Sequence, residues 1–157
     1  MPQLGEGLTG DLRSVFAAEA ASVQRYTYFA QVAEIEGHGE IARLFTDLAE
    51  SVACVAHGHI DALRDVADPH TRGSVGGTRL NLASSAAEAL HEANEVYPGL
   101  TAHAHEEGHA DVASWLTTLA SLKRAHLAKL DALLTALDQP LVPPSPGALA
   151  TDGGADV

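Results

Sequence analysis

The sequence predicts an all-α protein, a four-helix bundle made of two helical hairpins joined by a crossover loop. Apolar residues recur at a spacing of 3.6 along long segments, and alternating β-branched runs typical of strands are absent from the sequence. Breakers rich in Gly and Pro divide these segments into four. In addition, EGHGEIARLFTDLA (36–49) matches EGHADVASWLTTLA (107–120) at an offset of 71 residues. A repeated two-helix unit predicts two hairpins related by a pseudo-twofold axis.

The first two predicted helices form the first hairpin. Apolar periodicity supports a helix over about 11–36, ended by Gly37, and a second over about 40–66. The segment ADPHTRGSVGG then contains too much Gly, together with Asp-Pro, to continue a helix. We expect it to be a crossover that runs the length of the bundle, because it is long for a hairpin turn.

The second hairpin follows after Thr78, which is placed to cap the next helix. We predict a third helix over about 80–107, broken by Gly108, and a fourth over about 110–137. Residues 1–138 therefore form one domain. The remainder, 139–157, is rich in Pro, Gly and small residues that cannot bury enough surface to fold, so we predict a disordered tail.

Composition narrows the class of protein. The chain has 157 residues, 46% of them hydrophobic and 19% charged, which is typical of one globular domain. A net charge of −12 argues against nucleic acid or an anionic membrane as a partner. The sequence shows no signal peptide and no apolar run long enough to span a membrane, and its single cysteine, Cys54, excludes an internal disulfide. We therefore expect a cytoplasmic protein.

Several short motifs, taken together, are specific enough to indicate a protein family. They are RYTYFA in the first helix, an Asn-Leu pair near the start of the third, and Glu-x-Tyr-Pro followed by EEG. Over residues 11–135 the sequence resembles the rubrerythrin family of the ferritin-like superfamily. The resemblance implies a ferritin-like bundle with a dinuclear iron site, an oxidoreductase acting on peroxide or oxygen, and a homodimer, sometimes formed by exchanging hairpins. The family's Cys₄ rubredoxin-like module has no counterpart in this sequence, which has one cysteine.

The resemblance also implies which positions hold the metal ligands. In the first hairpin they fall on Glu19, in register with Tyr26, and on the Glu-x-x-His positions filled here by Val52 and Val55. In the second hairpin the Glu-x-x-Glu positions hold Ala89 and Glu92, and the last Glu-x-x-His positions hold Lys123 and His126. Glu19, Glu92 and His126 thus remain of seven ligands, and both bridging carboxylates, at positions 52 and 123, are replaced.

The charges of the remaining side chains suggest how the site is stabilised after the ligands at positions 52 and 123 are replaced. Two metal ions carry a charge of about +4 and need several carboxylates around them. Glu19 and Glu92 supply two negative charges, whereas Lys123 supplies a positive one, and a protonated His126 would make the cluster neutral without metal. Because a buried unpaired ammonium is costly, we expect Lys123 beside a Glu side chain, in the place of an ion. No metal is therefore expected.

Three functional classes remain open. In the first, the candidate site residues Glu19, Tyr26, Glu92, Lys123 and His126 form a metal-independent cluster. That cluster is either structural or a repurposed site in which Lys123 acts as a base or Schiff-base nucleophile. In the second, Glu19, Glu92 and His126 hold iron or manganese in an oxidoreductase of rubrerythrin type. In the third, the chain is a non-catalytic scaffold. Tyr26 and Tyr97 are the tyrosines to watch for modification, or core residues with a bonded hydroxyl.

Overall fold

The computed structural model describes residues 4–139. It consists of helices α1 (Glu6–Ile35), α2 (Gly39–Leu63), α3 (Thr78–His91), η1 (Glu92–Val96), α4 (Tyr97–Glu106) and α5 (Ala110–Asp138). These residues include no strand, so the all-α prediction is confirmed. Nearly all of the tail predicted at 139–157 lies outside the described residues. None of the helices is both long enough and apolar enough to cross a membrane.

The helices agree with the predicted segments, with differences at their ends. α1 begins at Glu6 rather than near residue 11, and its N-cap is Gly5, so the glycines at 7 and 10 are helical. α2 ends at Leu63, three residues before the predicted end. α3, η1 and α4 are consecutive and together make the single long helix that the sequence predicts. Both predicted helices of each hairpin are therefore present.

The two hairpin turns repeat the same backbone geometry. Gly37 and Gly108, in the matching EGH tripeptides, have φ angles of 83° and 81°. The His38 N–H donates to the Ala33 carbonyl at 2.8 Å, and the His109 N–H donates to the Ala104 carbonyl at 2.8 Å. Each glycine therefore ends its helix in the left-handed conformation that L-residues adopt at a cost, with a Schellman-type hydrogen bond across it. The repeat in sequence is a repeat in structure.

Each hairpin closes along a seam of small side chains. In the first hairpin, buried residues recur every seven positions on α2, and in the second a similar row lies on α3, η1 and α5. The buried apolar side chains include Ala42, Ala49, Ala56 and Leu63 in α2, Ala86, Ala89 and Ala93 in α3 and η1, and Ala113, Leu116 and Ala120 in α5. Leu63 is the largest side chain that is fully buried among the described residues. Alanine seams allow the paired helices to approach closely, but they bury little apolar surface.

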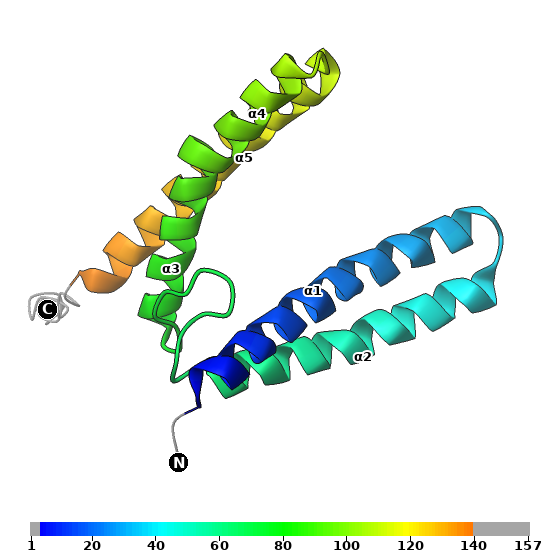
Figure 1. Ribbon diagram of the computed structural model, residues 1–157, viewed down its shortest axis with the longest axis horizontal. Helices are drawn as coiled ribbons and strands as arrows, with labels where there is room; N and C mark the ends of the chain where they lie inside the picture. The colour runs from blue at the N-terminus through cyan, green and yellow to red at the C-terminus, as the bar shows by residue number, and fades with distance from the viewer. Residues whose placement is uncertain (1–3, 140–157) are drawn as a thin grey trace, which may run out of the picture.

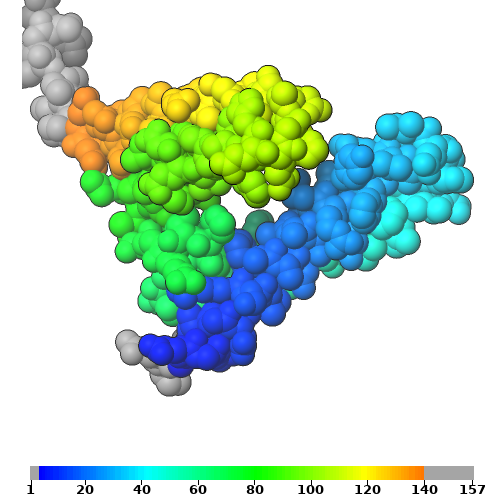
Figure 2. Space-filling view, turned by 45° about the horizontal axis from the view of Figure 1, so that its top comes forward, coloured from blue at the N-terminus to red at the C-terminus, as the bar shows by residue number. Residues whose placement is uncertain are grey.

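The two hairpins diverge from one end of the molecule (Figure 1). α1 packs on α2, and α3, η1 and α4 pack on α5, but in the described part of the chain no helix of one hairpin packs on a helix of the other. Figure 2 shows the same separation in a space-filling view. The chain thus has the two hairpins of a ferritin-like bundle, held apart.

The crossover, residues 64–77, lies at the junction of the hairpins and does not run along them as expected (Figure 1). Local hydrogen bonds explain why. One carboxylate oxygen of Asp68 accepts hydrogen bonds from the N–H groups of His70 and Thr71, both at 2.7 Å. The hydroxyls of Thr71 and Ser84 lie 3.0 Å apart, which fixes the loop to α3. A loop folded back in this way cannot extend along the bundle.

Candidate functional site

The candidate site lies where the long helix of the second hairpin is interrupted by η1, a π-helical turn. The N–H of Tyr97 donates to the carbonyl of Glu92, five residues earlier. Pro98 follows directly and has no N–H to donate to the preceding turn, which weakens the α-helical ladder at this point. π-helical turns of this kind are rare and frequent at functional sites. Glu92 is the first residue of the turn.

Glu92 forms an ion pair with Lys123 across the seam between η1 and α5. The ammonium nitrogen Nζ lies 2.6 Å from Oε2 of Glu92, and the two side chains are 26% and 23% exposed. The hydrogen bond to Glu92 raises the pKa of Lys123, against the opposing effect of burial, and the charges of Glu92, Tyr97 and Glu88 contribute in the same direction. The expected pairing of Lys123 with a carboxylate is therefore present, and Lys123 is an ammonium ion at neutral pH.

Arg124, the residue of α5 that follows Lys123, donates a hydrogen bond to the π-helical turn. Nη2 of Arg124 donates to the carbonyl of Ala93, a fully buried residue, at 3.3 Å. Carbonyls in such a turn lose their α-helical partners, so an outside donor compensates for part of that loss. Sequence reasoning missed both the π-turn and Arg124. The sequence contained a signal for the π-turn. The repeat offset of 71 pairs Glu19 with Leu90, whereas the ligand position that the resemblance implies is Ala89, one residue earlier. This difference indicates one extra residue between Ala89 and the part of the helix that follows the turn.

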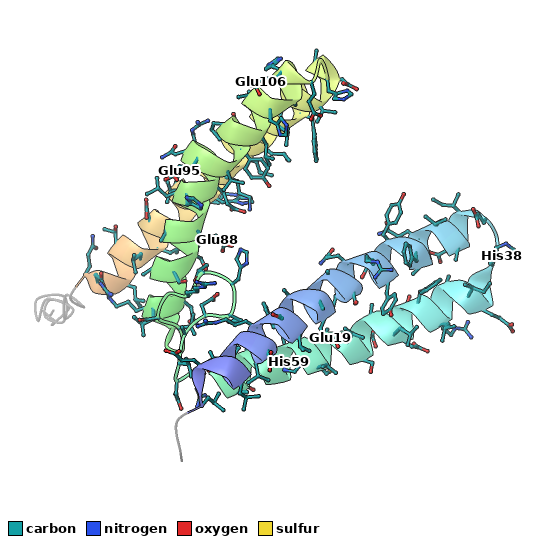
Figure 3. The ribbon with its side chains drawn as sticks, in the orientation of Figure 1. Glu19, His38, His59, Glu88, Glu95 and Glu106 are labelled. Atoms are coloured by element: carbon teal, nitrogen blue, oxygen red, sulfur yellow. The ribbon has the colours of Figure 1, made fainter. Side chains whose placement is uncertain are left out.

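Glu19 and Tyr26 belong to α1, the first helix of the other hairpin, and Figure 3 shows where Glu19 lies on it. Both are half-buried, and the ring of Tyr26 stacks on Phe45 of α2 with centroids 6.0 Å apart. No ion pair or side-chain hydrogen bond reaches Glu19 within residues 4–139. Val52 and Val55 of α2 complete this half, Val55 being 45% exposed. At the positions that the resemblance assigns to metal ligands, the first hairpin therefore offers one carboxylate and two hydrocarbon side chains.

His126 is exposed, although it lies only three residues after Lys123. The side of α5 that contacts the long helix carries Ala113, Leu116, Ala120 and Lys123, whereas His126 shares a stripe with Val112, Leu119 and Leu133. Of the five candidate residues, the chain thus brings together Glu92 and Lys123 and leaves Glu19, Tyr26 and His126 apart. The described residues contain no group of three or more His, Cys, Asp or Glu side chains placed to hold a metal ion.

An open hollow of about 730 Å³ lies between the crossover and α3 and includes Glu92 of the ion pair in its lining. Its lining includes His70 of the crossover, together with Glu88, His91, Glu92 and Val96. Nε2 of His70 lies 3.0 Å from Oε1 of Glu88, so the crossover forms one wall. A second polar feature lies in the first hairpin, where Nε of Arg13 and Nε2 of His59 are buried without a hydrogen-bond partner.

Comparison with known proteins decides the family. The family model described as rubrerythrin matches residues 12–134. The chain belongs to the rubrerythrin family. It is 32% identical over 127 residues to rubrerythrin of Porphyromonas gingivalis, covering 78% of this chain and 64% of that protein. It is 28% identical over 120 residues to rubrerythrin of Nitratidesulfovibrio vulgaris, covering 74% and 63%.

Solved structures similar to this rubrerythrin-family chain include nigerythrin in a mixed-valence state. The sequence identity is 25%, the TM-score is 0.40, and the match covers 88% of this chain and 70% of that one. The chain spans somewhat less than two thirds of the length of the two relatives named above.

Proposed function

We propose that this rubrerythrin-family chain has a metal-independent cluster in the place of a dinuclear metal centre. The observation that supports the proposal best is the ion pair between Lys123 and Glu92, with Nζ at 2.6 Å from Oε2. A carboxylate that would bind a metal instead binds an ammonium ion, and a second positive charge beside it would be repelled. In this proposal Lys123 supplies the positive charge that metal ions supply in a rubrerythrin site.

The remaining positions do not fit a dinuclear iron site. Val52, Val55 and Ala89 have no donor atoms, and Lys123 in its charged form has no free lone pair. Glu19, Glu92 and His126 are the donors that remain. Three donors are fewer than two metal ions need, and the pair of carboxylates that would bridge them is missing. We therefore assign no reaction step to a bound metal.

The electrostatics of the pair also favour one role for Lys123 over another. A Schiff-base nucleophile must be neutral, which requires a lowered pKa, whereas the hydrogen bond to Glu92 raises the pKa of Lys123. This favours a role as a fixed cation that orients Glu92 and holds the π-turn. An acid–base role would then depend on Glu92, with Lys123 positioning it, because His126 lies apart from the pair.

Metal analysis tests the proposal. The full chain, purified without chelator and incubated with ferrous iron under anaerobic conditions, is expected to retain no stoichiometric iron by elemental analysis. The matched control is a quadruple variant, V52E/V55H/A89E/K123E, which restores the residue types that the family resemblance implies, and we expect it to gain iron. Close to two irons per unaltered chain would contradict the proposal.

Family membership favours a second candidate, an oxidoreductase of rubrerythrin type that binds iron or manganese and acts on peroxide or oxygen. Its ligands would be Glu19, Glu92 and His126, with Lys123 turned away from Glu92. Peroxide consumption that requires added metal and is lost in Glu92→Gln and in Glu19→Gln would support this alternative. If the protein shows no peroxide consumption with or without added metal, and elemental analysis finds no bound iron, a structural role for the Glu92–Lys123 pair is favoured.

A further inference from the structure

The main-chain carbonyl of Ala93 has no backbone donor within its own helix. In an α-helix it would accept a hydrogen bond from the N–H of Tyr97, four residues later. That N–H donates instead to the carbonyl of Glu92. In the π-helical pattern the donor would be the residue five positions later, Pro98, which has no N–H. Because Ala93 is fully buried, its carbonyl depends on a donor from another helix.

Arg124 of α5 is that donor, with Nη2 at 3.3 Å from the carbonyl oxygen of Ala93. Within residues 4–139, no other side chain donates to the backbone of a different helix, and Arg124 forms no ion pair. An arginine on an exposed helix face usually lies in solvent or pairs with a carboxylate. A contact with a buried carbonyl therefore indicates a more specific role for this side chain.

Two consecutive residues of α5 thus hold two consecutive residues of the π-turn. Lys123 binds the carboxylate of Glu92, with Nζ at 2.6 Å from Oε2, and Arg124 binds the carbonyl of Ala93. The first contact holds a side chain, whereas the second holds the main chain next to it. A change of the backbone at Ala93 would therefore move the Glu92 carboxylate relative to Lys123.

We propose that Arg124 is a positioning residue for the Glu92–Lys123 pair. By donating to the Ala93 carbonyl, it fixes the π-turn at the place in the helix where the Glu92 carboxylate faces the Lys123 ammonium. This inference rests on the cluster assigned under the proposed function, and it adds the residue that holds the carboxylate of that cluster in place.

Loss of the Arg124 contact would favour a different position of the turn. The buried carbonyl of Ala93 would regain a donor if the N–H of Tyr97 turned back to it, as in an α-helix. The extra residue would then be accommodated before Glu92, and Glu92 would rotate by about 100° with the segment that follows the turn. Its carboxylate would leave Lys123.

The chain has two lysines, Lys123 and Lys129, which simplifies the test. Labelling with ¹⁵N-lysine gives one ammonium signal for the ion pair and one for the exposed Lys129, which serves as the internal reference. NMR of the full chain, in metal-free buffer at neutral pH, then measures how fast the ammonium protons of Lys123 exchange with water. Protons held by a carboxylate exchange slowly, because the hydrogen bond must open first.

Arg124→Met keeps an unbranched apolar stem and removes the donor. We expect this variant to raise the exchange rate of the Lys123 protons severalfold and to leave the Lys129 signal unchanged. A role of Arg124 as a neighbouring charge predicts the opposite sign, because removing a nearby cation favours the charged form of Lys123 and slows exchange. An exchange rate that stays the same or falls would overturn the proposal, even if the variant unfolds at a lower temperature.

A Pro98→Ala background provides the matched control. Alanine at position 98 supplies an N–H that can donate to the Ala93 carbonyl by the π-helical pattern, while Asn94 is exposed and its carbonyl can bind water. Alanine is also the better helix former, so this background remains usable if Arg124→Met alone does not fold. In it, Arg124→Met is expected to leave the slow exchange of Lys123 unchanged. A severalfold rise there would contradict the assigned role.

The outcomes also separate this inference from the proposed function. If Lys123 exchanges as fast as Lys129 in the unaltered chain, the Glu92–Lys123 pair itself is absent, and the proposed function fails together with the inference. If exchange is slow in the unaltered chain and Arg124→Met does not change it, the pair stands and only the positioning role of Arg124 fails.

Discussion

The two hairpins share their turns and seams but differ where their helices pass the middle. The first has uninterrupted helices, and Glu19 has no ion pair or side-chain hydrogen bond among its described residues. The second has a π-turn, an ion pair of Glu92 with Lys123, and a side-chain donor to a buried carbonyl. The shared parts explain how each hairpin folds, because both depend on a glycine turn and an alanine seam. The ion pair and the side-chain donor to the π-turn thus lie in the second hairpin, whereas the first has the buried Arg13 and His59 nitrogen atoms without a hydrogen-bond partner.

Reversing the charge of Lys123 is expected to have the largest effect on this difference. Lys123→Glu removes the ion pair and places two carboxylates side by side, so we expect a loss of about 2–3 kcal/mol in unfolding free energy at neutral pH. Urea denaturation in metal-free buffer measures it. Lys129→Glu, an exposed change on the same helix, is the matched control and should cost less than about 0.5 kcal/mol. If Lys123→Glu unfolds no earlier than the parent, the ion pair contributes nothing.

The glycine turns of the two hairpins, by contrast, should lose equal amounts of stability on substitution. Gly37→Ala and Gly108→Ala each place a Cβ on a residue with a φ near the left-handed region, at 83° and 81°. We expect each change to cost about 1–2 kcal/mol, with the two values close to each other. Thermal and urea unfolding of the two variants provide the measurement. A cost confined to one turn would mean that the two hairpins do not contribute alike to the cooperative unit.

A double-mutant cycle isolates the ion pair from other effects of substitution. Lys123→Met, Glu92→Gln and the double variant are expected to give a coupling energy of about 1 kcal/mol, since both side chains are partly exposed to solvent. The corresponding cycle with Lys129 in place of Lys123 serves as the control and should give a coupling near zero. Equal coupling in the two cycles would show that general charge balance, rather than the contact, is measured.

The smallest predicted effect is a dependence on alkaline pH. Because the pKa of Lys123 is raised in the folded protein, its contribution to stability is fully present below the unfolded value of about 10.4. That contribution is lost as the pH rises through the folded pKa. The difference in unfolding free energy between the parent and Lys123→Met should therefore shrink as the pH rises above the unfolded pKa and through the folded one. A difference that grows with pH would have the opposite sign and would exclude the ion pair as its cause.

Much of this architecture could be predicted from local signals. The glycines of the EGH repeat, the apolar periodicity and the Lys123 substitution predicted two hairpins and a paired ammonium. The π-turn was not predicted, because it changes a hydrogen-bonding pattern without changing apolar spacing by more than one residue. The separation of the hairpins was not predicted either. A stripe such as Ile41, Leu44 and Leu48 predicts an apolar face on the helix, but it does not show which segment packs there, and in this structure the three side chains are exposed.

The placement of His126 shows the same limit. Its spacing from Lys123 suggested one cluster, but Lys123 lies on the side of α5 that meets η1, whereas His126, three residues later, is exposed. Spacing along one helix gives the neighbours of a residue on that helix. Which of them share a site depends on the partner helix.

The π-turn at Glu92–Val96 has a consequence for the tolerance of this helix to insertions and deletions. The turn accommodates one extra residue, because its hydrogen bond spans five residues where an α-helical one spans four, and the helix keeps the same face towards α5 on both sides of it. Deleting a single residue between 94 and 96 would therefore restore a continuous α-helix, like α1, and leave Glu92 on the side that faces Lys123. A deletion elsewhere in the helix would instead rotate its two parts by about 100° relative to each other.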